Sequence, residues 1–512
     1  MVPRGRKAQH RGLAAEYETP KKLFRSMIPR MNRLQFAAVA VILTVGVAVL
    51  AQPSPTPADT VTFSEHVAPI VFANCVTCHR PGEAAPFSLM TYEDARLRGK
   101  TIAAVTRSRY MPPWKADAGD YSFVGERRLS ESQIDTLEQW VNGGLLEGDP
   151  KKMPKAPVFK EEWPLGKPDL VVSMPEAFEV PASGPDVFRN FVLALNLKKD
   201  QWIRAVDFRA SARKVVHHSL FFSDPSGQGR ELDAADPLPG FAGLMGGTGI
   251  VTGKLSPLEM VARVRGGQPL SQNAPAGGAR GGGALGGWVP GGGARTFPDD
   301  IALFAPKGSD LLVSTHFHPS GKVEREKSTV ALYFAKSAPS RPFMVLQMPP
   351  MVSAFKGINI PPGEANYVVS DSFVLPIDVK AFSTNAHAHY LAKEVKLTAT
   401  FPDRKVKTLL SISDWDINWQ GSYVFKDYVT LPAGTRLDAT IRYDNSASNR
   451  RNPSRPPVRV TFGEQSTNEM GAIGLGVIAT TPGSLPRLRD AYDQHLRQEI
   501  LASPLMRGRG AR

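Results

Sequence analysis

The chain has 512 residues, 42% of them hydrophobic, and it carries 62 Lys and Arg against 48 Asp and Glu, a formal net charge of +14. This length and composition exclude a disordered chain and predict several folded domains. Nine of the basic residues lie within residues 1–33, so half of the excess charge belongs to one tail, which argues against a nucleic-acid-binding protein.

The basic tail at residues 1–33 continues into an uncharged, mostly apolar stretch at 34–52. A positively flanked run of this length fits either a signal peptide or a short membrane anchor, and the Pro- and Thr-containing stretch after it favours export over a buried helix. We therefore expect a protein of the bacterial periplasm or of the periplasmic face of the inner membrane. It would contact the membrane through this segment if the segment is not cleaved.

Residues 58–150 contain the pentapeptide Cys75-Val76-Thr77-Cys78-His79. This spacing predicts covalently bound haem c, in which two thiols form thioethers and the adjacent imidazole binds iron. A redox or zinc C-x-x-C site is the alternative, but the chain has only two cysteines. The sixth iron ligand should be a methionine or a histidine downstream, and we predict Met111, in a Pro-rich loop, with Met90 as the competitor.

The same region shows helical periodicity. Its last helix should begin at Ser130, whose spacing to Gln133 is that of a capping box, and should stop at Gly143. The span of residues 63–148 resembles a small class I cytochrome c, with the two cysteines, the histidine and the methionine named above at the positions of its haem motif. That resemblance implies electron transfer through the haem.

Beyond a linker at residues 151–167, short runs of β-branched and aromatic residues alternate with turns. Such runs are typical of sandwiches and jelly rolls, and they extend too far for one of these. We predict β domains at 168–345 and 346–485, a glycine-rich insertion at 246–293 and a basic C-terminal tail at 486–512. The predicted fold class is therefore multidomain: a small all-α cytochrome c domain followed by two all-β jelly-roll or sandwich domains.

Six of the ten histidines form three close pairs, at residues 217–218, 316–318 and 387–389. Residues two apart in a strand project from one face, so His387 and His389 lie side by side as half of a metal site. Adjacent His217 and His218 face opposite sides of a regular strand, so they need a bulge or a strand end to bind one metal. Imidazole suits copper, zinc, iron or nickel, and histidines satisfied by ordinary hydrogen bonds are the alternative.

Four motifs that include these pairs occur in a fixed order. They are VVHH at 215–218, LVSTHFHP at 312–319, HAHYLAK at 387–393 and TNEM at 467–470. This order resembles the ascorbate-dependent type II copper monooxygenases, the family of peptidylglycine α-hydroxylating monooxygenase and dopamine β-hydroxylase. The match covers roughly 300 residues, and four ordered motifs are more specific than any single one.

The resemblance implies two copper ions, each with three protein ligands. The electron-transferring copper would be held by His217, His218 and His316, and the oxygen-activating copper by His387, His389 and Met470. A thioether stabilises Cu(I), which suits a copper that is reduced before it meets O2, although Met470 taken alone also fits a core position. His318 matches no family ligand, and we interpret it as a hydrogen-bonding neighbour, or an assistant, of His316.

The predicted function is a haem- and copper-dependent monooxygenase that hydroxylates an unknown organic substrate with O2. A redox partner would reduce the haem, and electrons would pass to the copper at His217 and then to the copper at His387. Asn385 and Gly474 stand where the peptide-hydroxylating member has an arginine and a tyrosine, which argues against a peptide ending in glycine as the substrate. The rival hypotheses are a non-catalytic periplasmic electron carrier or copper-binding protein, and a β module whose histidines bind no metal.

Overall fold

The computed structural model describes residues 60–507, apart from 84, 160–162, 243–256, 267–283, 291, 299, 340 and 464. The predicted signal peptide or anchor at 34–52 and most of the glycine-rich insertion lie outside the described residues. In the part of the chain that is described, no helix is both long and apolar enough to cross a membrane.

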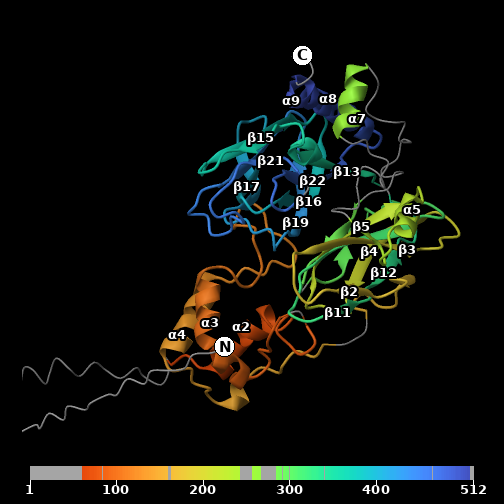
Figure 1. Cartoon of the computed structure of the whole chain (residues 1–512). Helices are drawn as coiled ribbons and strands as arrows, with labels where there is room; N and C mark the ends of the chain where they lie inside the picture. Colours follow the sequence, from red (N-terminus) through yellow and green to blue (C-terminus); the bar gives the residue numbers. More distant parts are fainter. Residues whose placement is uncertain are drawn as a thin grey trace, which may run out of the picture. The chain divides into compact units, whose positions relative to one another are not determined.

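The N-terminal part of the described chain is helical (Figure 1). Its elements are the π-helix η2 (Phe63–Val67), α2 (Ala68–Asn74), α3 (Tyr92–Arg107) and α4 (Glu131–Asn142). The predicted capping box is confirmed: the Gln133 N–H donates to the Ser130 hydroxyl, and the Ser130 N–H donates to the Gln133 side chain. The apolar faces of these helices meet in a core around the fully buried Trp140.

Two five-stranded antiparallel sheets share one buried core. The first has the order β1 (Leu170–Ser173), β12 (Thr329–Phe334), β4 (Gln201–Arg209) and β8 (Arg295–Thr296), with β9 (Leu303–Ala305) also on β4. The second has the order β6 (Phe241–Ala242), β3 (Val187–Ala194), β10 (Asp310–Phe317), β5 (Val216–Asp224) and β7 (Ala284–Trp288). A two-stranded ladder joins β11 (Glu324–Glu326) to β2 (Phe178–Val180). Phe208 and Phe221, one from each large sheet, meet in the shared core.

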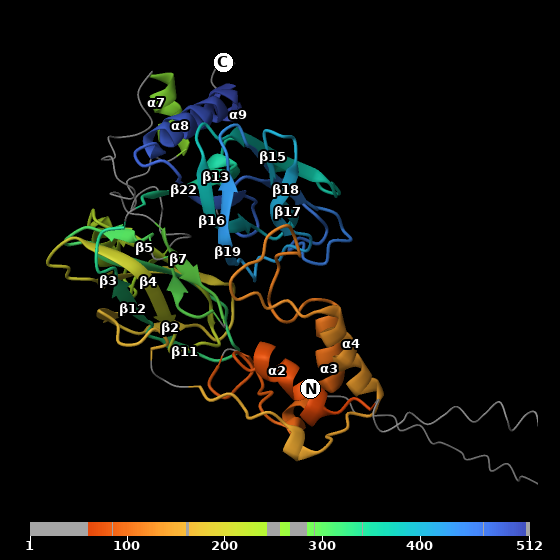
Figure 2. The same ribbon diagram turned by 180° about the vertical axis from the view of Figure 1, so that it is seen from behind.

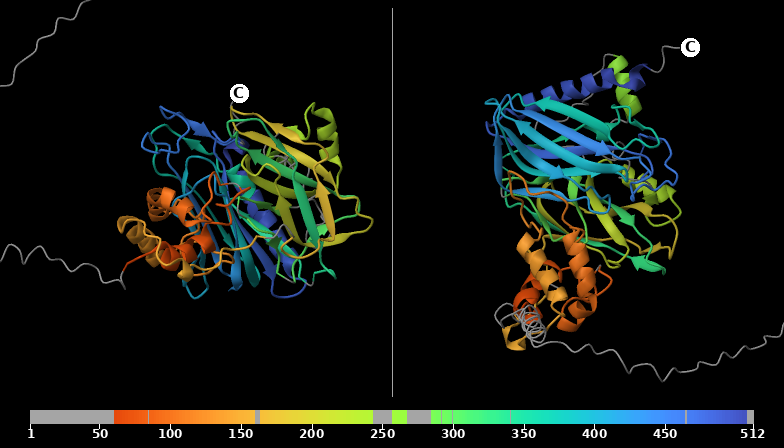
Figure 3. Two further views of the ribbon diagram at one scale, coloured as in Figure 1. Left: turned by 90° about the horizontal axis from the view of Figure 1, so that it is seen from below. Right: turned by 90° about the vertical axis from the view of Figure 1, so that its left-hand side faces the viewer.

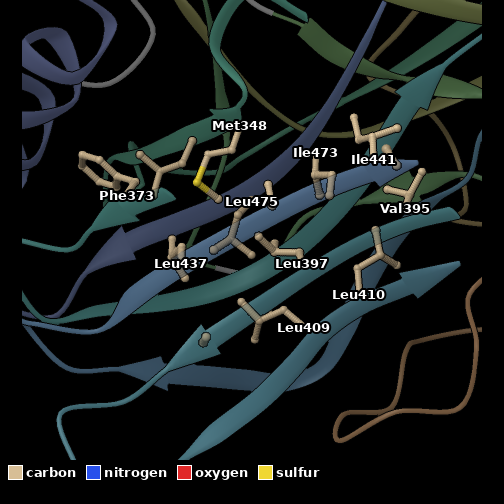
Figure 4. Close-up of a cluster of buried hydrophobic side chains, with 14 of the residues drawn as sticks. Met348, Phe373, Val395, Leu397, Leu409, Leu410, Leu437, Ile441, Ile473 and Leu475 are labelled. Carbon is tan, nitrogen blue, oxygen red and sulfur yellow. The ribbon is translucent and has the colours of Figure 1, made fainter. Parts of the chain in front are cut away.

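Two four-stranded antiparallel sheets enclose a second β core (Figure 4). One has the order β13 (Phe343–Met348), β22 (Gly471–Ala479), β16 (Val379–Ala388) and β19 (Ser422–Leu431). The other has the order β15 (Tyr367–Val374), β20 (Arg436–Tyr443), β17 (Ala392–Thr400) and β18 (Val406–Ile412). A short ladder pairs β14 (Asn359–Ile360) with β21 (Val460–Thr461). Leu397, Leu437 and Leu475 pack between the sheets, because alternate residues of each strand face inward.

The C-terminal segment predicted as a basic tail contains a helix of 18 residues, α8 (Leu485–Ala502), followed by α9 (Pro504–Arg507). Leu485 and Leu488 join the second β core, while Leu496 and Ile500 pack with α7 (Pro257–Arg265). Figures 1 and 3 show α7 and α8 side by side. The remaining helices are η3 (Pro150–Lys152), α5 (Gln228–Ala235) and η5 (Pro350–Ser353).

The predicted fold class is wrong in how it divides the chain. Val61–Arg512 is one compact, mostly β unit, and the helices belong to it instead of forming a separate small all-α domain. The reason lies between α3 and α4, where residues 110–128 leave the helical core and bind the second β core. Phe123 forms an antiparallel bridge with Phe425 of β19, and the Asp117 N–H donates to the Ser411 carbonyl at 2.7 Å. Figure 2 shows this loop reaching the strands near β19.

Candidate metal centre

The first histidine cluster lies where β5 and β10 pair. His218 is opposite His316, but the next pair is Val216 with Phe317, so the register shifts and His217 has no partner on β10. This is the bulge that two adjacent histidines need in order to face one point. His217, His218 and His316 each offer a ring nitrogen, and the three nitrogens lie within 4.8 Å of one another. A single metal ion fits that spacing.

Asp186, just before β3, orients His316. Its Oδ2 lies 2.7 Å from His316 Nε2, and the His316 ring stacks on Phe188 with ring centroids 4.2 Å apart. A carboxylate accepts hydrogen bonds, so Nε2 carries the ring proton and Nδ1 keeps its lone pair. His316 Nδ1 is buried and has no hydrogen-bond partner among the described residues. A buried polar atom without a partner requires an explanation, and a metal ion supplies one.

The rings of His217 and His218 are held in the neutral form that binds metal. Their Nδ1 atoms lie 3.2 Å apart. Burial and the nearby His316 together lower the pKa of His217 to about 4, and burial and the same neighbour hold the pKa of His218 well below its usual value. The exposed His318 donates from Nδ1 to Asp186 Oδ1 at 2.8 Å, so it shares the carboxylate that orients His316.

The second cluster begins on β16. His387 Nδ1 lies 2.6 Å from Gln420 Oε1, and Gln420 Nε2 donates to the Ile417 carbonyl, which fixes the orientation of the amide. His387 Nδ1 therefore carries the proton, and its Nε2 is buried without a hydrogen-bond partner in the described structure. His389 Nδ1 lies 3.1 Å from the Asn468 carbonyl, so its lone pair is also on Nε2. Burial lowers the pKa of His387 and lowers that of His389 to about 3.

The motif at 467–470 contacts His389 of this pair. The side-chain oxygens of the buried Glu469, whose pKa burial raises to about 8, accept from the backbone N–H groups of His389 and Leu391, at 3.1 and 2.6 Å. Ala388, the last residue of β16, pairs with Gly471, the first residue of β22, and the buried Met470 comes directly before this pair. No described contact joins the Met470 thioether to the two imidazoles, and Met470 stays a predicted ligand.

One loop contacts both clusters. Asn418 hydrogen-bonds His217 with its side chain, and Gln420 hydrogen-bonds His387. Two residues of extended chain span at most about 7 Å, so the two clusters lie in one region of the molecule. In agreement, His387 is among the charges that lower the pKa of His218, after burial, His316 and His217.

The predicted haem motif at residues 75–79 continues helix α2 as a turn. The N–H of His79 donates to the Cys75 carbonyl, and His79 Nδ1 lies 3.1 Å from the Phe87 carbonyl, so Nδ1 carries the proton. Nε2 is then the free ligand atom, which is the arrangement that an axial histidine requires. Burial raises the pKa of the Cys75 thiol to about 12 and raises that of Cys78, so both thiols are protonated at neutral pH.

The two candidate methionines lie in different surroundings. Met111 is half-buried and lines a cavity of about 410 Å³, together with Trp114, Lys115 and Asp414. This volume lies within the range of small-molecule and cofactor sites. Met90 packs against the helical core that also holds Cys75. No described contact joins either thioether to His79, and Met111 stays a prediction.

A further cluster of possible metal ligands, Asp371, His495 and Glu499, is already neutralised. Lys356 Nζ lies 3.3 Å from Asp371 Oδ1 and 2.7 Å from Glu499 Oε2, and His495 Nε2 lies 3.0 Å from Asp371 Oδ2. The ammonium occupies the position from which a cation would be bound. We assign this cluster to an ion-pair network that fixes α8 on β15.

No sequence pattern marks the residues that orient the histidines. Asp186 is 130 positions from His316, and Gln420 is 33 positions from His387. A lone Asp after a turn and a lone Gln in a loop have no motif of their own. Only the strand register and the loop conformation bring them to the imidazoles.

The comparisons with known proteins do not identify a family. No protein-family model and no curated protein matches the sequence. The major capsid protein P2 of bacteriophage PM2 is 8% identical, with a TM-score of 0.22 over 61% of this chain and 98% of that one. The VP2 subviral particle protein of infectious bursal disease virus is 8% identical, with a TM-score of 0.18 over 63% and 75%. PNGF-II is 10% identical, with a TM-score of 0.24 over 60% and 64%. Likenesses this slight carry no argument about function.

Proposed function

We propose that this protein is an exported haem- and copper-dependent oxidoreductase of the monooxygenase type, which hydroxylates an organic substrate with O2. The observation that carries the proposal is the pair of buried, unpartnered imidazole nitrogens, His316 Nδ1 and His387 Nε2, each in a separate histidine cluster. Asp186 and Gln420 set the tautomer of these rings, so both lone pairs are presented for metal binding.

The donor sets favour copper. His217, His218 and His316 would hold one ion, and His387, His389 and Met470 the other. Imidazoles bind both oxidation states of copper, and a thioether favours Cu(I). Zinc accounts less well for Met470, since structural and catalytic zinc sites use nitrogen, oxygen and thiolate ligands. When bound, copper supplies one-electron redox chemistry and O2 activation, and haem c at Cys75, Cys78 and His79 supplies an entry point for electrons.

The chain's own residues prepare these sites. Burial keeps the imidazoles neutral, so protons do not compete with the metal at neutral pH. Asp186 and Gln420 prevent the rings from turning, and this lowers the cost of organising the ligands. Glu469 holds the backbone of His389 and Leu391, and thereby fixes the second set of ligands against β22.

The substrate is not a peptide anchored in the manner of the peptide-hydroxylating family. A Cβ on Gly474 would lie 2.3 Å from Asn385 Oδ1, so a larger side chain does not fit there while Asn385 stays in place. The Asn385 side chain therefore occupies the space that a larger side chain at position 474 would need, and neither of these two positions is open to hold such a peptide. This observation also favours a second candidate, a periplasmic electron carrier that binds copper and hydroxylates nothing.

Elemental analysis of the haem-loaded protein tests the proposal. We expect two coppers per haem, one of them lost in His387→Ala, weaker Cu(I) binding in Met470→Leu, and full copper content in the control His495→Ala, whose imidazole belongs to the ion-pair network. Zinc in place of copper, or no metal, would overturn the proposal. Two coppers that cycle between oxidation states without substrate-dependent O2 consumption across a substrate screen would support the electron carrier.

A further inference from the structure

A chain of aromatic rings joins the loop between α3 and α4, which carries the predicted haem ligand Met111, to the second β core. Trp114 lies three residues after Met111, and its ring meets the Tyr423 ring edge-on with centroids 5.2 Å apart. Phe123 packs on Tyr423 at 5.2 Å and stacks on Phe425 at 5.2 Å. Tyr423, Phe123 and Phe425 are all buried, while Trp114 is half-buried.

From Tyr423 the contacts lead to His387. A Cβ on Gly421 would lie 2.9 Å from the Tyr423 hydroxyl oxygen, which means that the bare Gly421 backbone rests on the phenol ring. The next residue back, Gln420, bonds His387 Nδ1 at 2.6 Å. The connection from the Trp114 ring to the His387 ring therefore consists of one ring contact, one packed backbone segment and one hydrogen bond.

We propose that Trp114, Tyr423 and Gln420 form the electron entry route into this protein, and that it delivers electrons from the haem segment directly to the metal at His387. The inference rests on the proposed function, because it requires a haem at Cys75, Cys78 and His79 with Met111 as its sixth ligand, and a copper at His387. It revises the order of electron transfer predicted from the sequence, in which electrons reach the copper at His217 before the copper at His387. Electrons tunnel better through bonded and touching atoms than across gaps, so continuous contact is the property that a route needs.

A second connection in the described structure joins the haem segment to the first β core, and this connection is an ion pair. Glu83, five residues after Cys78, pairs with Arg213, which lies four residues before His217. Arg213 is partly exposed, Glu83 is buried, and the pair contains no aromatic ring. Saturated side chains in contact with water conduct electrons less well than packed rings, so we assign a docking role to the pair and the conducting role to Trp114 and Tyr423.

The transfer is balanced as a one-electron step. Iron(II) is oxidised to iron(III) and copper(II) is reduced to copper(I), and no bond forms or breaks. Burial raises the pKa of the Tyr423 phenol well above its usual value, so the hydroxyl keeps its proton at neutral pH. Tyr423 therefore acts as a medium for the electron and does not need to exchange a proton.

Flash reduction of the haem by a photoexcited flavin, followed by the decay of the reduced haem absorbance, measures the route without turnover. Haem and copper contents are determined first, and copper-free protein gives the baseline in which the haem stays reduced. We expect severalfold slower transfer in Trp114→Leu and in Tyr423→Leu. Tyr423→Phe, which keeps the ring, should transfer at the parent rate. The matched control is Tyr121→Leu, which removes a ring that contacts Phe425 but lies off the route.

The outcomes separate the inference from the function on which it rests. Copper-loaded Trp114→Leu that transfers as fast as Tyr121→Leu would overturn the route, and so would slow transfer in Arg213→Gln combined with a normal rate in Trp114→Leu. A parent protein that binds no copper would overturn the proposed function instead. If Tyr423→Leu fails to fold, Trp114→Leu alone decides, because Trp114 is only half-buried and belongs to no strand.

Discussion

Asp186→Asn tests the orientation of the first cluster most directly. The Asp186 carboxylate accepts from His316 at 2.7 Å and from His318 at 2.8 Å. Burial alone would raise the pKa of Asp186, but the hydrogen bonds from these histidines hold it below its usual value, so the group is ionised at neutral pH. An asparagine can turn its NH2 toward His316 Nε2. The ring proton then moves to Nδ1 and removes the lone pair that a metal needs.

The expected loss follows from these contacts. A hydrogen bond to a charged group contributes about 1.5–3 kcal/mol, and residues that orient metal-bound histidines typically change metal affinity about 10- to 100-fold. Because Asp186 is partly exposed, we assign its hydrogen bond with His316 a free energy at the low end of this range, about 1.5 kcal/mol. Loss of this bond corresponds to roughly tenfold weaker copper binding at the first site. Competition with a copper chelator measures the affinity of the first site.

The control is Asp438→Asn on β20, where the carboxylate accepts from the Ser372 hydroxyl at 2.6 Å and touches no histidine. We expect parent affinity in that variant. An Asp186→Asn protein that binds copper at both sites as tightly as the parent would refute the reasoning, because it would show that His316 does not depend on Asp186 for its tautomer.

The remaining predictions concern the second cluster and stability. Gln420→Ala should weaken copper at the His387 site roughly tenfold while leaving the first site unchanged, since it frees the His387 ring; equal losses at both sites in the chelator assay would contradict this. Leu397→Ala, at a fully buried position, should lower the free energy of unfolding by about 2–5 kcal/mol in denaturant titrations, and a loss below about 1 kcal/mol would be inconsistent with the packing of the second β core. Ser130→Ala should cost about 1 kcal/mol by loss of the α4 cap, with Ser130→Asn close to the parent. Burial would raise the pKa of Asp414, but hydrogen bonds from Arg451 and Lys115 depress it below the unfolded value, so this stabilisation is present above a pH of about 4 and is lost in more acidic solution. Thermal unfolding of Asp414→Asn should accordingly depend less on pH in the acidic range than that of the parent, and parallel curves would contradict the assignment.

The local patterns in the sequence were sufficient for local structure. The spacing of Ser130 and Gln133 determines the α4 cap, because both partners lie within one helical turn. The adjacency of His217 and His218 required a bulge if both were to meet one metal, and the shifted register of β5 against β10 provides it. In each case the interacting groups are close in the chain, so their order along it constrains their geometry.

Long-range packing decided the rest. Asp186 and Gln420 reach their histidines only after distant segments are paired, and nothing in their own neighbourhood marks them. The loop that binds Phe123 to β19 joins the helices to the β sheets, which is why the expected separate all-α domain is absent from the described unit. A hydrophobic pattern predicts which face of a helix or strand is buried, but it does not predict which other helix or strand packs on that face. The sequence by itself therefore determined the α4 cap, the histidine pairs and the short strands of the β region, while the tertiary structure alone decided which residues orient those histidines, that the C-terminal segment is the helix α8, and which core the helical segment contacts.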